Sequence, residues 1–383
     1  MLKNKRESNF ERLRILAMFM IVASHYASHG IEKVLVEGEA YRAWAAGGII
    51  NKAFTALMNP GGEVGVALLF MITGYFQIKK DKVSWKRLVM TVIFYSFFAM
   101  LLCLGILLFG GSIPYMSGQN IATFFLRSLF MPLSSTAWWF VAVYVFLMLL
   151  SPVYNRFLKE LNRKGFLVFL LVFWLIWYGL AGVIGTEFFN LQKALFFYGI
   201  GAFIRLYREK APARPCFWGL ISSAAWLGSS FCFFQLGQLA ASGGNPVYRE
   251  LLSRGWSAAS SMLMVPLCAL GAFMLFKGLS AGFSPLINRI ASATFGIYLI
   301  HDSLIGRPFI WYSLIQPAER QYPSAIYPLL ALLTVMILFA VCALLDLLRQ
   351  KLFLPAMEQA GDRILKRLRK AFLKDPDNPQ KTA

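Results

Sequence analysis

Long apolar stretches constrain this chain more than any other feature of its sequence. Of the 383 residues, 58% are hydrophobic and only 15% are charged, which is the composition of a membrane protein rather than a soluble one. A helix of roughly 20 apolar residues crosses a hydrocarbon core of about 30 Å, and about ten stretches are long enough. We therefore predict an all-α, multi-pass membrane protein with spans near 13–30, 62–78, 88–109, 136–154, 166–184, 191–206, 216–236, 256–276, 291–311 and 326–348.

The distribution of positive charge predicts the orientation of these helices. The chain carries 38 Lys and Arg against 18 Asp and Glu, a net charge of +20. The basic residues form short clusters between apolar stretches, which is typical of cytoplasmic loops and argues against a nucleic-acid partner. With the N-terminus inside, the clusters at 79–87, 155–164 and 205–214 and the basic tail all fall on the inner side. We therefore predict that both termini face the cytoplasm.

The end of the chain differs from the membrane part. After Pro355, apolar residues recur at helical spacing among Lys and Arg side chains, which predicts a basic amphipathic helix on the lipids of the inner leaflet. A solvated charged tail is the alternative. We divide the chain into an integral membrane domain at 1–350 and a basic cytoplasmic tail at 351–383.

Ionisable side chains inside apolar spans indicate where chemistry takes place, because burying them in a membrane is costly. The first span carries Arg14, His25 and His29 on one helical stripe, with Arg14 and His25 about 16 Å apart along the axis. His301 lies at a similar depth in the ninth span, so His25 and His301 could face one cavity. A histidine that only bonds a neighbouring helix is the alternative for each. Asp302 points about 100° away from His301 on a helix and is a weaker candidate.

These residue types predict acid–base chemistry on an anionic substrate. Imidazole exchanges protons near neutral pH, and a guanidinium binds phosphate or carboxylate. Arg14 at the inner end therefore predicts an anionic cosubstrate that enters from the cytoplasm. Near the outer surface, Glu63, His29 and Trp139 are candidate substrate contacts, although Trp139 also fits an interfacial aromatic belt. Three histidines with few spaced carboxylates predict no metal site, and no Walker or HExxH motif occurs.

Four motifs, in this order, resemble those of the integral membrane acyltransferases of the acyltransferase-3 family, which O-acylate bacterial surface carbohydrates. The first is an Arg-x10-His pattern, LRILAMFMIVASH, with Arg14 and His25; the others are GVALLFMITGYF, AWWFVAVYVFLMLLSPVYN, and GIYLIH with Tyr298 and His301. LFFYGIGAFIRLY at 195–207 also resembles the family. One departure is Ala67, where many members have an acidic residue. Another is that the chain has no room for the extra-cytoplasmic SGNH hydrolase-like domain of many members.

The resemblance implies a multi-pass enzyme of the bacterial cytoplasmic membrane. It would move an acyl group, expected to be acetyl, from cytoplasmic acyl-CoA to a hydroxyl of a cell-surface or lipid-linked carbohydrate. Arg14 would hold the donor, His25 would act as general base, and His301 and Tyr298 would position or polarise the hydroxyl. The alternative is that His25 itself carries a transient acyl group. Without the hydrolase-like domain, the membrane domain either completes the transfer or hands the acyl group to a partner acyltransferase outside the membrane.

Two other classes of protein would share some of these features. A transporter or flippase for a lipid-linked sugar would also use about ten spans and buried histidines, but should show paired broken spans in two matching halves, which this sequence lacks. A membrane sensor or scaffold would signal through the basic tail, and His25 would then be replaceable.

Overall fold

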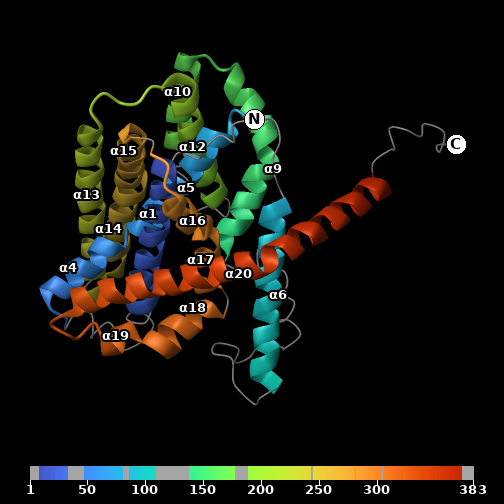
Figure 1. Ribbon diagram of the computed structural model, residues 1–383. Helices are drawn as coiled ribbons and strands as arrows, with labels where there is room; N and C mark the ends of the chain where they lie inside the picture. Colours follow the sequence, from blue (N-terminus) through green and yellow to red (C-terminus); the bar gives the residue numbers. More distant parts are fainter. Residues whose placement is uncertain are drawn as a thin grey trace.

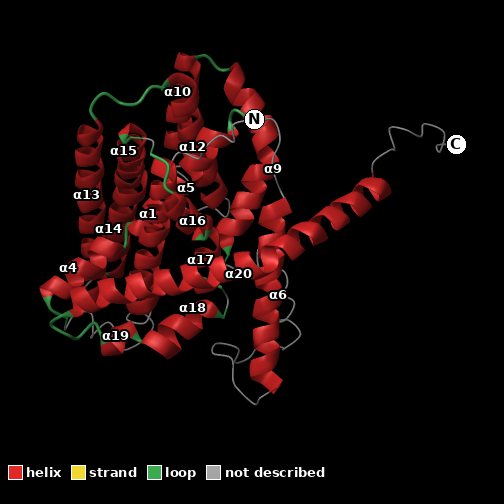
Figure 2. Ribbon diagram, in the orientation of Figure 1, coloured by secondary structure: helices red, strands yellow, loops and turns green. Residues whose placement is uncertain are grey.

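The computed structural model describes residues 8–32, 47–80, 86–108, 138–176, 189–242, 245–280, 282–303 and 305–372. These residues are almost entirely helical and include no strand, which confirms the predicted all-α class. Figures 1 and 2 show a bundle of helices that the long C-terminal helix α20 (Tyr327–Phe372) crosses before it extends past α6 (Lys86–Leu108).

Within the part of the chain that the structure describes, five helical segments are long and apolar enough to cross a membrane, namely Ile49–Gln77, Trp139–Glu160, Pro215–Ala241, Pro246–Gly278 and Tyr327–Arg367. The chain is thus a helical membrane protein. About ten spans with both termini inside remain a prediction, since part of the predicted fifth span lies outside the described residues. The segment between the first two predicted spans contains a helix, α4 (Ile49–Met58).

Helix α5 (Gly61–Gln77) packs against α1 (Ser8–His25) on one side and α12 (Phe189–Tyr207) on the other. Glycines allow these helices to approach closely, as in many membrane bundles. A Cβ atom on Gly74 would lie 2.0 Å from the Tyr198 carbonyl oxygen, and one on Gly65 would lie 2.5 Å from that of Ala17. Helix α1, which carries Arg14 and His25, is therefore packed closely against α5.

The other described helices surround this central group. Helix α15 (Val265–Gly278) packs on α13 (Pro215–Ala241) and on α5. The remaining elements are η1 (Tyr26–Glu32), α9 (Trp139–Glu160), α10 (Arg163–Phe173), α14 (Pro246–Ala258), η3 (Ala259–Met264), α16 (Pro285–Ser292), α17 (Thr294–His301), α18 (Gly306–Pro308), η4 (Phe309–Ile315) and α19 (Pro317–Arg320).

The ninth predicted span, 291–311, is interrupted. Helix α17 is only eight residues long and ends at His301. The chain turns there because Ser303 Oγ accepts a hydrogen bond from the Gly306 amide at 2.8 Å, and the Asp302 carboxylate accepts one from Arg307 Nε at 2.8 Å. This break places His301 at a helix end rather than in mid-helix.

The final helix is longer than the sequence suggests. The predicted span at 326–348 and the predicted tail helix after Pro355 are parts of one helix, α20, which continues through Pro355. Past that residue, Met357 is buried and Lys86 Nζ on α6 forms an ion pair with Asp362 Oδ2 at 2.6 Å. Contact between this tail and the inner leaflet remains a prediction.

Candidate active site

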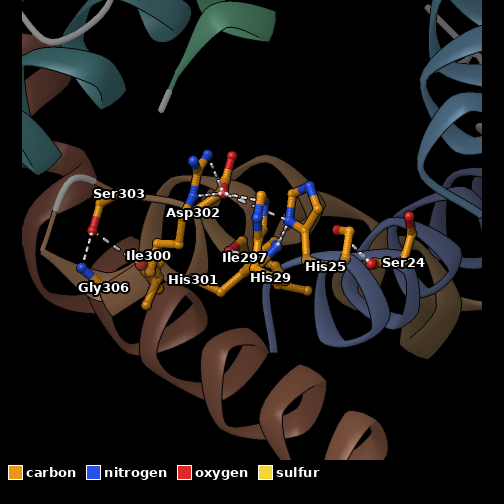
Figure 3. A network of polar contacts seen from close by, with 11 residues as sticks. Ser24, His25, His29, Ile297, Ile300, His301, Asp302, Ser303 and Gly306 are labelled. Carbon is orange, nitrogen blue, oxygen red and sulfur yellow. Dashed lines mark hydrogen bonds and ion pairs between the residues drawn. The ribbon is translucent and has the colours of Figure 1, made fainter. Parts of the chain in front are cut away.

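The structure brings the three histidines of the chain together. Helix α1 ends at His25 and continues into the π-helical η1, which carries His29, and both residues lie beside the end of α17. His25 Nδ1 is 2.9 Å from His301 Nε2, and the His25 and His29 ring centroids are 4.9 Å apart (Figure 3). Residues nearly 280 positions apart in sequence thus form one cluster.

The hydrogen bonds of His301 determine which nitrogens carry protons. His301 Nδ1 lies 2.6 Å from the Ile297 carbonyl oxygen, one turn earlier on α17. A carbonyl can only accept, so His301 Nδ1 carries the proton and Nε2 of the neutral ring is an acceptor. His25 Nδ1–H then donates to His301 Nε2, which leaves the lone pair of a neutral His25 on Nε2. The tautomer of His25 is therefore the one that a general base at Nε2 requires.

Asp302 and Arg307 complete the polar cluster. Asp302 is fully buried, and its Oδ1 lies 2.7 Å from Arg307 Nη2, 3.6 Å from His25 Nδ1 and 3.9 Å from His29 Nε2. A carboxylate at this distance stabilises positive charge that develops on the His25 ring. The prediction that Asp302 points away from the site assumed a continuous helix. Because α17 ends at His301, Asp302 lies outside the helix and its side chain approaches His25 and His29.

Arg307 also belongs to the site, although it is not among the residues predicted from the sequence. It lies within the predicted ninth span, so the criterion that selects Arg14, an ionisable side chain in an apolar stretch, would also have found it.

Three side chains have the chemistry and proximity of metal ligands. One ligand atom each from His25, His29 and Asp302 lies within 4.8 Å of the others. A cation there would have to displace the Arg307 guanidinium from Asp302 and compete with the His25–His301 hydrogen bond. These contacts do not favour a metal, and its absence stays a prediction.

A cavity of about 360 Å³ opens on one side of the histidine cluster. Its lining includes the predicted site residues His25, Tyr298, His29, Glu63 and Trp139. His301 is fully buried behind His25. We call this space the outer cavity.

Glu63 has a charged partner at the edge of the outer cavity. Glu63 Oε2 accepts a hydrogen bond from the buried Lys193 Nζ at 2.5 Å, so Glu63 has a partner on α12. His29 lines the same cavity.

Arg14 lines a different cavity, of about 330 Å³, which we call the inner cavity. Tyr144, Asp346 and Arg349 contribute to its wall. Arg14 Nη1 forms an ion pair with Glu11 Oε1 at 3.1 Å, one turn earlier on α1. The predicted donor-binding arginine and the predicted base therefore lie on one helix but in two separate spaces.

Together these features define a helical membrane protein with a buried polar cluster beside one cavity and an arginine-lined second cavity. A family model described as an acyltransferase domain matches residues 7–347, which include the site residues named above except Arg349. The chain belongs to this acyltransferase-3 family, and it is an acyltransferase. No curated protein and no solved structure matches the chain.

Proposed function

We propose that this protein transfers an acyl group, acetyl in the first instance, from cytoplasmic acyl-CoA to a hydroxyl of a cell-surface or lipid-linked carbohydrate at a bacterial cytoplasmic membrane. One observation carries the proposal: the hydrogen-bonded series from the Ile297 carbonyl through His301 to His25. This series leaves His25 Nε2 able to accept a proton, and His25 borders the outer cavity.

The reaction follows from this arrangement. The acceptor hydroxyl enters the outer cavity, and His25 Nε2 takes its proton while the oxygen attacks the thioester carbonyl carbon. The carbon–sulfur bond of the tetrahedral intermediate breaks, and the protonated His25 returns the proton to the departing CoA sulfur. The products are the O-acyl sugar and free CoA. Asp302 stabilises the His25 imidazolium between the two steps, since its Oδ1 lies 3.6 Å from Nδ1.

The other predicted residues take supporting roles. Arg14 in the inner cavity binds the anionic part of the donor, for which a guanidinium is well suited. His301 positions His25, and Tyr298 reaches the acceptor through the outer cavity, which it lines together with Glu63 and Trp139.

The first test uses purified protein in liposomes with radiolabelled acetyl-CoA and a crude glycolipid extract. CoA release and label transfer are measured for wild type and for His25→Ala. Removal of a general base typically costs about 10²–10⁴-fold, so we expect at least a 100-fold loss that added imidazole partly restores. A well-folded His25→Ala protein that keeps full turnover would overturn the assignment. Absence of turnover with any acyl-CoA, combined with movement of a lipid-linked sugar, would indicate a flippase.

The positioning role of His301 has its own test. In His301→Gln the amide oxygen can still accept the hydrogen bond from His25 Nδ1, whereas in His301→Leu nothing can. We expect the Gln variant to keep substantially more turnover than the Leu variant at equal thermal stability. Equal activity of the two variants would mean that His301 only fills space.

A further inference from the structure

The inner and outer cavities meet at a wall of three apolar side chains. Met18 on α1, Leu69 on α5 and Phe140 on α9 line both cavities. Met18 lies on the stripe between the two functional residues of α1, about 6 Å along the axis from Arg14 and about 10 Å from His25. The wall therefore stands between the arginine of the inner cavity and the histidine of the outer one.

An acyl group must cross this wall if the proposed function is right. The donor's anionic part binds near Arg14, while the base that activates the acceptor lies beyond Met18. The thioester end of the donor therefore has to pass between Met18, Leu69 and Phe140 to reach the acceptor hydroxyl. Among the described residues that line them, the two cavities share no polar side chain, so the passage is apolar.

The three side chains differ in how easily they move. Phe140 is 6% exposed and is held by rings on several sides, with centroids 5.1 Å from Phe70 and 5.5 Å from Tyr298. Met18 is 2% exposed but unbranched and adaptable, and Leu69 is only partly buried. Because Phe140 is held in place while Met18 and Leu69 can change rotamer, the wall can open a passage wide enough for a narrow group.

We infer that Met18, Leu69 and Phe140 select the acyl group, admitting short uncharged acyl groups and excluding longer or carboxylate-bearing ones. This inference rests on the proposed function and narrows its donor to acetyl-CoA and its near homologues. Length matters because one extra methylene in a tight apolar site changes specificity by about 10–200-fold. Charge matters because a carboxylate loses its hydration in an apolar passage without gaining a partner.

The test compares acetyl-, butyryl- and succinyl-CoA in the liposome assay. Butyryl and succinyl groups have the same number of carbons and differ in a terminal methyl or carboxylate, so the pair separates length from charge. Leu69→Ala removes three carbons from the wall. We expect it to raise kcat/KM for butyryl-CoA relative to acetyl-CoA at least about tenfold, and to leave succinyl-CoA a poor donor.

Two control variants accompany Leu69→Ala. Leu69→Met conserves the volume of the wall and should keep the wild-type donor profile. Leu149→Ala makes the same truncation at a side chain that is 59% exposed and lines neither cavity, so it should also keep that profile.

The outcomes separate this inference from the function on which it rests. An active wild type whose preference among the three donors is unchanged in Leu69→Ala would overturn the inference alone. A wild type that prefers succinyl-CoA would overturn it as well. A wild type that transfers no acyl group from any donor would instead remove the proposed function.

Discussion

Asp346 on α20 holds a buried polar network, and its removal should be strongly destabilising. Its side chain is fully buried and accepts hydrogen bonds from Tyr95 Oη at 2.6 Å, Arg349 Nε at 2.7 Å and Gln350 Nε2 at 2.6 Å. Asp346→Ala would leave Arg349, itself 6% exposed, without its counter-ion. Removal of one partner of a buried ion pair costs about 3–5 kcal/mol, which is the loss in unfolding free energy that we expect.

A double-mutant cycle separates this pairing from simple loss of packing. Replacing both partners by apolar residues, as in Asp346→Leu with Arg349→Met, removes both charges and leaves no unpaired ion. Such replacements of a buried pair are often neutral, so the double variant should be more stable than either single variant. Reversible unfolding in mixed micelles gives the four free energies. Single substitutions that each cost less than about 1 kcal/mol, or strictly additive costs, would refute the reasoning.

Three smaller predictions concern glycines and an exposed ion pair. A Cβ atom on Gly296 would lie 2.1 Å from the Asp346 carboxylate, so Gly296→Ala should lower thermal stability in wild type and be tolerated in Asp346→Ala. Gly255 on α14 has no atom of a described residue within 4 Å of such an atom, so Gly255→Ala should raise the unfolding free energy by about 0.5–1 kcal/mol, and a loss would contradict the helix assignment there. Lys79 Nζ donates a hydrogen bond to Glu209 at 2.9 Å and thereby lowers the pKa of that carboxyl. The ion pair is therefore complete above the ordinary glutamate pKa and is lost as the pH falls through the lowered pKa of Glu209. Lys79→Ala should raise the pKa of Glu209, which carboxyl carbon NMR measures.

Much of the candidate site follows from helical periodicity within one span. The eleven-residue interval between Arg14 and His25 predicts a shared stripe, and both residues do line cavities along α1. The motif GIYLIH supplies Tyr298 and His301, and Tyr298 lies in the same cavity as His25. Apolar length and composition alone also determine that the chain is helical and membrane-embedded, because these properties depend on local residue content.

Only the tertiary structure decides how separate helices meet at the site. Helical periodicity places Asp302 away from His301, but α17 ends at His301 and Asp302 instead approaches His25 and His29. The partner of Glu63 proves to be Lys193, which belongs to a helix more than a hundred residues away. Periodicity fixes neighbours within one helix, whereas contacts between helices depend on where helices break and how their small residues let them pack. The apolar wall between Arg14 and His25 arises in the same way, because its three side chains come from three different helices.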